Sequence, residues 1–332
     1  FACFMEKCGQ LVKMNGLYAM ITQHAWMFLS SYEKLREKLK MNSIVDMAHL
    51  GARAFDEIGG EVVQTTAFVS CGRRVADFKG TYVRLVDIVG EWEKEAEYRS
   101  GNHRYIAKQE NFSKIPGSPV AYWVSENFVR AFERGISIDS ISDFTGSQHK
   151  TADNEKYLRM FWEVGKSSVN SKKWIFYIKG GNYRKWYGNI DLVIDWSENA
   201  KLFYKRNLTS NMIKEKYWYQ EGITYTSLTN STNTFRYLPP IGIFDIKGPS
   251  IVKVKDMYYC LGMLNSKVAV IFYKTLNATM TLQVKDVKNI PIIIDDGSKS
   301  IVSVIVKENI DVCKKDWDSF ETSWDFERHP LV

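Results

Sequence analysis

The sequence predicts an α/β domain that is followed by a mixed α+β domain. Its 332 residues suffice for two domains of ordinary size, and 45% of them are hydrophobic, as in a folded globular protein. Helical and strand-like segments alternate up to about residue 112, which favours a mostly parallel sheet. After Thr145 the segments become short and β-rich, with turn residues between them. We therefore expect an α/β domain over 1–112, a junction over 113–144, a second domain over 145–307, and the start of a further region over 308–332.

Alternating helical and strand patterns carry the prediction for the first domain. The expected elements are a helix over 1–14, strands over 17–22, 43–51 and 61–71, and a helix after the capping-box pair Ser30 and Glu33. In that helix Tyr32, Leu35 and Leu39 fall on one face. The last two strands are adjacent in sequence, so we expect them to form an antiparallel edge of the sheet.

The first domain lacks the opening of a complete nucleotide-binding sheet. Such a domain begins with a strand and a Gly-rich turn over the cofactor. Here Gly59 and Gly60 follow no strand and open no helix, so we interpret them as a loop. The first ten residues, FACFMEKCGQ, carry neither an initiator Met nor a signal-peptide pattern. We therefore expect half of a domain, cut from a longer chain.

Composition and spacing exclude several classes. No apolar run approaches the ~20 residues that cross a bilayer, so no membrane partner is expected. The cysteines are odd in number and form no C-x-x-C pair, which argues against a disulfide framework or a zinc site and favours a reducing cytoplasm. They are Cys3, Cys8, Cys71, Cys260 and Cys313. The five histidines show no metal-ligand spacing, and no nucleophile-elbow or P-loop pattern occurs.

The second domain reads as a mixture of short strands and helices. The expected strands are WIFYIK, IDLVIDW, ITYTSL and GIFDI. Asp153 is a plausible N-cap for a short helix whose buried stripe is Tyr157, Leu158, Phe161 and Trp162. A helical period returns in MYYCLGMLNSKVAVIFYKTL through Leu261, Leu264, Val268 and Ile271. An extended stretch that ends in VKNIPIII follows.

The excess positive charge of the chain lies in the second domain. Residues 145–307 hold 24 Lys and Arg against 13 Asp and Glu, whereas residues 1–144 hold 18 of each sign. Residues 308–332 are acidic, with 3 basic and 7 acidic side chains. This placement suggests that one domain meets a polyanion and the other does not. The alternative is a basic surface that is merely solvated.

The stretch GGNYRKWYGN, residues 180–189, lies between two predicted strands and is an unusual turn. Gly and Asn favour the backbone conformation of a tight turn. A tight turn does not require three aromatic rings and two cations exposed to water. Neighbours on a turn cannot all point inward. The tip therefore either packs against a neighbouring domain or touches a partner that accepts both positive charge and flat rings.

Four further segments give the chain a family resemblance. They are KIPGSPVAYWVSENF, TGSQHKTADNEKYLRMFWEV, FRYLPPIGIFDIKGPSI and DWDSFETSWDFERHPL, of which the last is the most specific. With these motifs the chain resembles the large adenine-specific DNA methyltransferases of bacterial BREX phage-defence systems, the PglX family. The resemblance implies a partial Rossmann-like class I methyltransferase sheet over 1–112 and a target-recognition domain over 145–307. Residues 308–332 would then lead into a C-terminal region.

The resemblance also implies an activity that this chain should not have alone. Enzymes of this kind transfer a methyl group from S-adenosylmethionine to adenine N6. They use a Gly-rich cofactor turn and an Asn/Asp-Pro-Pro-Tyr/Phe loop, whereas the Pro-Pro pair here, at Pro239 and Pro240, has neither neighbour. We expect no complete cofactor site and no catalytic residue in this chain. Phe55 matches the position of an aromatic that stacks on the flipped base, or it is a core residue beside a loop.

The resemblance identifies double-stranded DNA as the expected polyanion. Lys and Arg hold phosphates, while forked or planar donors read base edges. The expected DNA-binding residues are Gln148, Lys172, Lys173, Lys179, Asn182, Tyr183, Arg184, Lys185, Trp186, Lys205, Arg206, Lys214, Thr226, Ser227, Asn233 and Arg236, with Lys216 a further candidate for a phosphate. In residues 180–189, Arg184 and Lys185 would engage DNA while Tyr183 or Trp186 packs on sugar or base.

Two other functions remain open from the sequence. The chain could be a stand-alone DNA specificity module that works with a separate catalytic chain. It could instead be a docking surface for another phage-defence protein or for a phage-encoded inhibitor that mimics DNA. Such an inhibitor would favour the same basic surface, so charge alone does not separate it from DNA.

Overall fold

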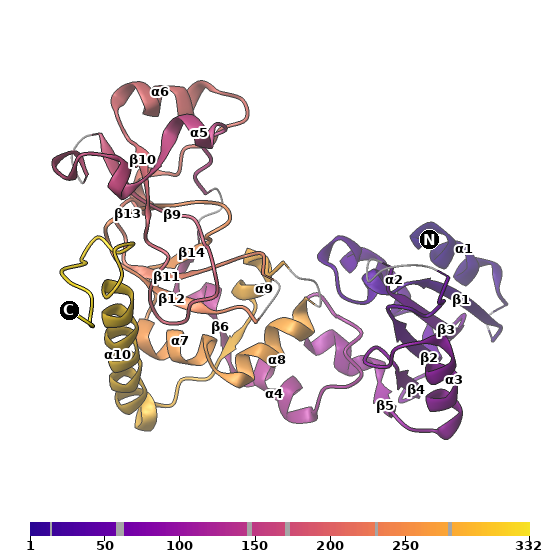
Figure 1. Ribbon diagram of the computed structural model, residues 1–332. Coiled ribbons are helices and arrows are strands. Elements are labelled where there is room, and N and C mark those ends of the chain that lie inside the picture. The colour runs from indigo at the N-terminus through magenta and orange to yellow at the C-terminus, as the bar shows by residue number, and fades with distance from the viewer. Residues whose placement is uncertain (14, 58–62, 145–147, 170–172, 230–231, 278–280) are drawn as a thin grey trace. The chain divides into compact units, whose positions relative to one another are not determined.

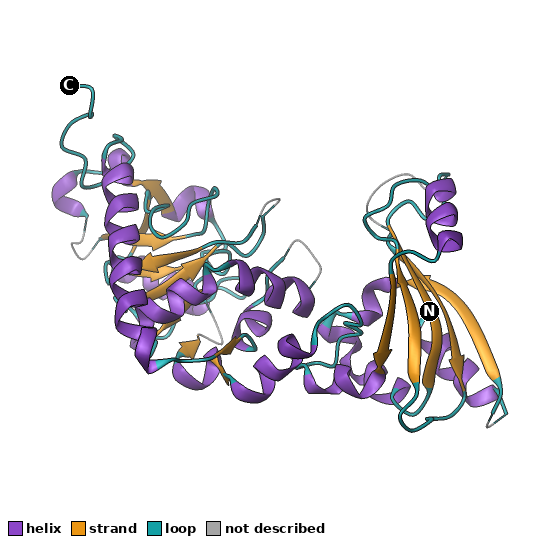
Figure 2. Cartoon of the chain, turned by 90° about the horizontal axis from the view of Figure 1, so that it is seen from below, coloured by secondary structure: helices purple, strands orange, loops and turns teal. Residues whose placement is uncertain are grey.

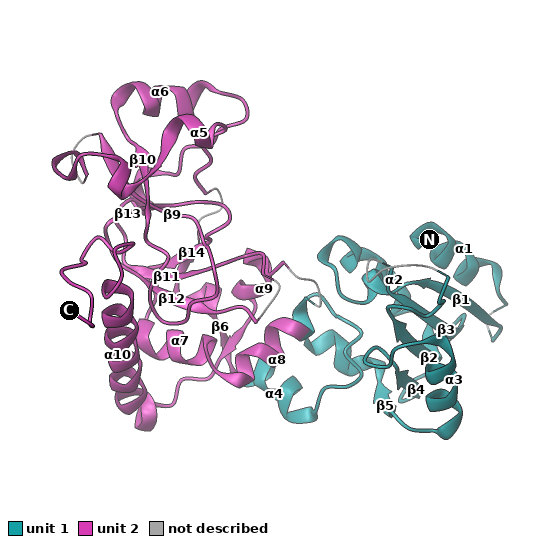
Figure 3. Ribbon diagram, in the orientation of Figure 1, with its two compact units in different colours: residues 1–134, 275–278 teal, residues 135–274, 279–332 magenta. Residues whose placement is uncertain are grey.

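The computed structural model describes residues 1–13, 15–57, 63–144, 148–169, 173–229, 232–277 and 281–332. The chain divides into two compact units, which Figure 3 shows in different colours. Unit 1 is Phe1–Arg134 with Thr275–Ala278, and unit 2 is Gly135–Lys274 with Thr279–Val332. The division falls inside the predicted junction. The predicted boundary at residue 307 lies within one continuous helix of unit 2.

Unit 1 is built on a five-stranded sheet with the order β1-β3-β2-β4-β5 (Figures 1 and 2). The strands are β1 (Leu17–Gln23), β2 (Ser43–Gly51), β3 (Thr65–Cys71), β4 (Lys79–Arg84) and β5 (Arg104–Lys108). Three of the predicted strands are therefore confirmed. The expected mostly parallel sheet is wrong, because among the described strands only the β2–β4 pair is parallel. β3 inserts antiparallel between β1 and β2, so the antiparallel strand is central and not at the edge.

Helices cover one face of this sheet and form the core of unit 1. They are α1 (Ala2–Leu11), η1 (His24–Met27), η2 (Ser30–Tyr32), α2 (Glu33–Leu39) and η3 (Gln109–Lys114), and α4 (Glu126–Arg134) follows outside this core. Met5, Trp26 and Leu35 pack with Phe68 and Tyr82 of the strands. The predicted capping box is wrong: among the described residues no side chain caps α2, because Ser30 begins the 3₁₀ turn that precedes it.

The other face of the sheet carries α3 (Glu91–Ser100). The hydroxyl of Tyr98 donates to Asp46 at 3.4 Å, and the ammonium of Lys94 donates to the backbone oxygens of Leu50 and Leu85 at 2.7 and 2.8 Å. These bonds hold α3 over β2 and β4. At the β1 edge, Leu17 and Ile21 remain 60% and 62% exposed.

Unit 2 contains two four-stranded sheets and one two-stranded sheet (Figure 1). The first, of order β13-β9-β10-β8, joins β8 (Leu158–Met160), β9 (Trp174–Ile178), β10 (Leu192–Asp195) and β13 (Gly242–Phe244). The second, of order β12-β11-β14-β7, joins β7 (Asp143–Phe144), β11 (Gly222–Tyr225), β12 (Phe235–Leu238) and β14 (Ser250–Val252). The third pairs β6 (Ile136–Ser137) with β15 (Pro291–Ile292). The four strands predicted after residue 173 are therefore confirmed.

The helices of unit 2 are mostly short. They are η4 (Ile138–Ile141), α5 (Asn154–Tyr157), η5 (Phe161–Glu163), η6 (Lys166–Ser168), α6 (Glu198–Arg206), η7 (Glu215–Tyr217), α7 (Met257–Leu264), α8 (Lys267–Leu276), α9 (Val284–Lys288) and α10 (Asp296–Asp318). α8 runs past the division, so its end is counted with unit 1. Asp153 caps α5 through the backbone N–H of Lys156, as predicted.

Two predicted apolar stripes in unit 2 are only partly correct. α5 lasts one turn and β8 follows it, so Trp162 lies half exposed while Tyr157 and Leu158 are buried. The predicted helix over 257–276 breaks at Asn265 and Ser266 into α7 and α8. This break turns Val268 and Ile271 outward.

Three further features of the described residues concern helix hydrophobicity, cysteines and potential metal ligands. No described helix has the combination of length and apolar character that crossing a bilayer requires. The five cysteines are free thiols. No cluster of three or more potential metal ligands occurs in the described parts of the chain.

Candidate nucleic-acid interface

The loop over 179–191 connects the antiparallel strands β9 and β10 of unit 2. Gly180, Gly181 and Gly188 all have positive φ angles, which a glycine adopts without strain. The backbone N–H of Trp186 donates to Phe235 at 3.1 Å, and Tyr237 donates back to Trp186 at 2.8 Å. The middle of the loop is thereby held beside β12 by a single parallel bridge between Trp186 and Arg236.

The charged and aromatic tip of this loop is divided between packing and exposure. The guanidinium of Arg184 lies 4.7 Å from the ring centre of Trp317 on α10 and 3.1 Å from the carboxylate of Asp316. Tyr187 is buried near Lys314, and burial raises the pKa of its phenol to about 12. Tyr183, in contrast, is 61% exposed. The tip thus packs against a helix of its own unit and still presents one ring to solvent.

A cavity of about 520 Å³ opens between the loop and α10. Its lining residues are Asn182, Tyr183, Arg184, Lys185, Tyr187, Asn189, Asp191, Cys313, Asp316, Trp317 and Thr322. Burial raises the pKa of the Asp191 carboxyl. The Asp316 and Trp317 side chains were not predicted from sequence, because the acidic end of the chain read as a separate region.

A polar network beneath the loop joins several predicted residues. Arg236, only 1% exposed, donates to the hydroxyl of Thr226 at 3.2 Å and to the backbone oxygen of Arg184 at 3.4 Å. Thr226 donates in turn to the backbone oxygen of Gly181 at 3.2 Å, and Asn233 donates to the backbone oxygen of Thr226 at 3.0 Å. Burial lowers the pKa of Arg236 to about 10, so the guanidinium stays charged at neutral pH. In this structure Arg236 supports the loop and is not presented at the surface.

The remaining predicted residues fall into three groups. Exposed side chains are Lys173, Lys205, Arg206, Lys214 and Lys216, and partly buried ones are Lys179, Lys185 and Ser227. Gln148 is buried, and its backbone oxygen accepts a hydrogen bond from Asn211. Lys172 lies outside the described residues, as do Gly59 and Gly60 of unit 1. The structure therefore brings the residues of the loop and of β12 together, while Lys205 and Arg206 lie on α6 and Lys214 and Lys216 follow it in the chain.

Unit 1 has a polar group where β1 and β2 end. His24 Nδ1 and His49 Nε2 lie 2.8 Å apart, and His49 Nδ1 lies 3.0 Å from the hydroxyl of Tyr122. Burial lowers the pKa of His24 to about 4 and, with the nearby His24, lowers that of His49. Both rings are therefore neutral at pH 7. Phe55 is in the loop that follows β2 and is 42% exposed.

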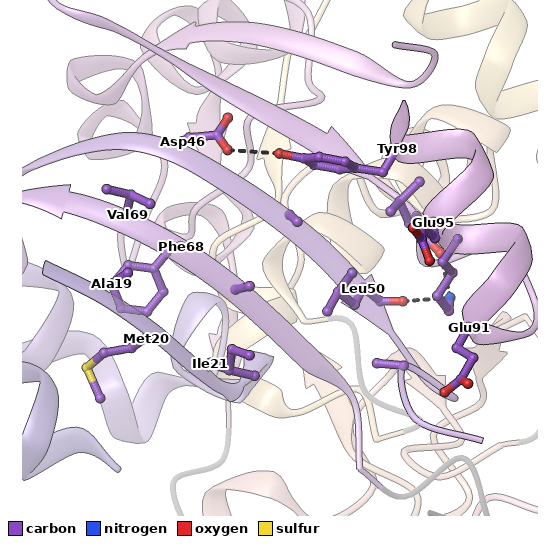
Figure 4. A pocket seen from close by; sticks show the side chains of 15 residues that line it. Ala19, Met20, Ile21, Asp46, Leu50, Phe68, Val69, Glu91, Glu95 and Tyr98 are labelled. Atoms are coloured by element: carbon purple, nitrogen blue, oxygen red, sulfur yellow. Dashed lines mark hydrogen bonds between the residues drawn. The ribbon is translucent and has the colours of Figure 1, made fainter. Parts of the chain in front are cut away.

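The sheet face of unit 1 that carries α3 borders a second cavity, of about 550 Å³ (Figure 4). Figure 4 shows Ala19 and Ile21 of β1 on one side and Glu91, Glu95 and Tyr98 of α3 on the other. Most of its lining is apolar. The described lining includes no Gly-rich turn.

Two curated proteins match the chain along its whole length. One is the adenine-specific methyltransferase PglX of Lacticaseibacillus casei (strain Zhang), at 36% identity, of which the chain covers 30%. The other is the adenine-specific methyltransferase BrxX of Escherichia coli O9:H4 (strain HS), at 34% identity, of which the chain covers 28%. The chain thus spans less than a third of these relatives. The family resemblance predicted from its motifs is confirmed.

Solved structures of restriction-modification enzymes share the fold. The Type IIL enzyme MmeI, solved in complex with DNA, superposes with a TM-score of 0.56 at 8% identity over 98% of this chain and 44% of MmeI. A nuclease-deletion mutant of the Type ISP enzyme LlaGI, in complex with a DNA substrate mimic, gives 0.50 at 10% identity over 92% of this chain and 30% of LlaGI. No protein-family model matches the chain. At such low sequence identity, these structural similarities support only the mixed α/β fold class.

Proposed function

We propose that this relative of the PglX-type adenine-specific methyltransferases supplies DNA target recognition within a site-specific adenine-N6 DNA methyltransferase of a BREX-like phage-defence system. The observation that carries the proposal is the match over the whole chain to two adenine-specific methyltransferases. The basic excess over residues 145–307 supports it, because phosphate attraction dominates affinity for DNA. S-adenosylmethionine would be held by parts of the enzyme beyond this chain.

Unit 1 would be the rear part of the methyltransferase sheet. β1 and β2 both run antiparallel to β3, so they are parallel to each other, and β1 leaves one edge unpaired among the described strands. An unpaired edge with exposed Leu17 and Ile21 suits the addition of a further strand. The carboxyl ends of β1 and β2, near His24 and Phe55, would face the reacting base, since α/β sheets bind ligands at that edge.

Phe55 would stack on the flipped adenine. In the complete enzyme, Phe55→Ala is expected to lower turnover roughly tenfold, because base–aromatic stacking contributes about 1–3 kcal/mol. A fluorescent base analogue at the target position would report less extrusion. The matched control is Phe4→Ala, which removes another exposed phenylalanine, on α1. Equal turnover and equal fluorescence in wild type and Phe55→Ala would rule out the stacking role.

Unit 2 would contact DNA through its exposed cations and through the loop over 179–191. Asn182, Tyr183 and Lys185 are among the members of the loop that line the cavity beside α10. Arg184 is held by Asp316 and Trp317, and Arg236 fixes the loop from below. Asn182 and Arg184 would read base edges, and the lysines would hold phosphates.

Binding of the chain to short duplex DNA, followed by fluorescence anisotropy over a salt series, tests this function. We expect affinity to fall steeply with salt, and the slope of the logarithmic plot to decrease by about one for each phosphate contact removed. Arg184→Ala combined with Lys185→Ala should therefore lower both affinity and slope. The control, Lys34→Ala with Lys38→Ala, removes the same charge from exposed positions of α2 in unit 1. No binding at low salt would contradict the proposal.

A further inference from the structure

The turn that follows α6 holds an apolar side chain fully in water. Leu208 is 101% exposed, more than any other large apolar side chain among the described residues. A single exposed leucine is ordinary on a protein surface and needs no function. Leu208 differs because it belongs to a hydrogen-bonded turn whose flanking segments carry exposed cations.

Hydrogen bonds lock the turn. The side-chain oxygen of Asn207 accepts from the backbone N–H and the hydroxyl of Thr209, at 2.9 and 2.8 Å, and from the N–H of Ser210 at 3.1 Å. The hydroxyl of Ser210 donates to the backbone oxygen of Tyr204 at 2.8 Å. Tyr204 is itself buried, with its hydroxyl on Asp195 at the end of β10 at 2.9 Å. The backbone of the turn is therefore anchored to the sheet on both sides of Leu208.

Four exposed cations lie on the segments next to this turn. Lys205 and Arg206 directly precede the turn, and Lys214 follows it. Lys150 is placed beside the turn by a backbone pair with Asn211, at 2.8 and 2.9 Å. Within the described parts of the chain, none of the four has a carboxylate at ion-pair distance, although other lysines of unit 2 do, such as Lys201 with Glu198. Their charge is free to meet an external anion.

The chemistry that fits both features is a polyanion with an apolar interior. Duplex DNA presents phosphates on its outside and stacked bases within, and apolar side chains inserted between base pairs unstack and bend it. A membrane would need a larger apolar surface than one leucine. A protein partner would bury a wider apolar patch than the turn offers.

We propose that Leu208 is a wedge that inserts between base pairs of bound DNA while Lys205, Arg206, Lys214 and Lys150 hold the flanking phosphates. The inference rests on the proposed function, since it requires that the chain bind DNA. It adds a second contact surface, separate in sequence from the loop over 179–191. Pre-organisation favours the insertion, because the hydrogen-bonded backbone of the turn has less conformational freedom to lose on binding.

The test compares Leu208→Ala with wild type on a duplex enriched for tight binding from a pool with a randomised centre. Loss of the buried side chain should weaken binding about tenfold, and the salt slope should not change because no phosphate contact is lost. With Leu208→Ala, a fluorescent base analogue in the duplex should no longer report unstacking. Leu208→Met should restore both signals, because it can still insert. Lys205→Ala with Arg206→Ala should instead lower the slope by about two.

The control is Leu202→Ala, which removes an exposed leucine of α6 from the same surface region. Thermal unfolding of each variant checks that the fold is intact. If the wild-type protein binds DNA and Leu208→Ala keeps both the affinity and the fluorescence signal, the wedge proposal is wrong. The proposed function would then still stand. Wild type that binds no DNA would overturn both.

Discussion

Replacement of Arg36 by Met is expected to lower the free energy of unfolding of unit 1 by about 3 kcal/mol. The side chain is buried, and its nitrogens donate to the backbone oxygens of Trp26, Leu29 and Gly117, each at 2.8 Å. Met has a similar length but no donor, so three carbonyl oxygens would lose their partner. Each unsatisfied buried group costs about 1–3 kcal/mol, which is partly offset because a buried charge is also removed.

Urea denaturation followed by near-ultraviolet circular dichroism measures the Arg36→Met change. Hydrogen exchange of β1 and β2 assigns the loss to unit 1. Arg36→Lys should recover part of the stability, because one ammonium reaches fewer of the three oxygens. The control is Arg130→Met on α4, whose exposed pair with Glu126 should contribute less than about 1 kcal/mol. If Arg36→Met also lowers the free energy of unfolding by less than about 1 kcal/mol, the three hydrogen bonds do not contribute to stability.

Local sequence patterns predicted most strands of unit 1 but not their pairing. The runs that became β1, β2 and β3 show the alternation and β-branched content of strands, and both are local properties. That β3 inserts between β1 and β2 depends on which hydrophobic faces meet across the sheet, and sequence spacing does not report this. The capping-box pair was wrong for a related reason, because Ser30 was used by a 3₁₀ turn that a three-residue spacing also fits.

The sequence predicted which residues make up the candidate interface, but not which of them pack against the protein and which stay exposed. Residues 180–189 were singled out because rings and cations are unusual in a turn, and the structure brings them together around one cavity. The partner of Arg184 is Asp316, which lies 132 residues later in the chain. No local pattern signals a contact of that range. Leu208 was missed because one leucine in a polar stretch becomes informative only when its exposure is known.

The second large expected effect is an acid-dependent loss of stability in unit 2 through His149. Its ring is fully buried among Tyr177, Trp196 and Tyr204, and neither ring nitrogen has a hydrogen-bond partner among the described residues. Burial lowers the pKa of His149 from 6.5 to about 3. Well above pH 6.5 the ring is neutral in both the folded and the unfolded chain, so its titration does not change stability there.

As the pH falls below 6.5, the unfolded chain binds a proton at His149 and the folded chain does not. Stability is therefore lost progressively until the pH reaches the folded pKa of about 3. A pKa unit corresponds to about 1.4 kcal/mol, so the expected loss is about 2 kcal/mol at pH 5 and about 3 kcal/mol at pH 4. His149→Phe keeps the aromatic packing and removes the titration. Its unfolding free energy should match wild type at pH 7 within about 1 kcal/mol and exceed it increasingly at lower pH.

Urea denaturation of wild type and His149→Phe at several pH values between 7 and 4 measures this difference. Taking the difference cancels the contributions of His24, His49 and the carboxylates, which both proteins share. A difference between wild type and His149→Phe that stays flat from pH 7 to 4 would mean that the buried ring does accept a proton in the folded protein.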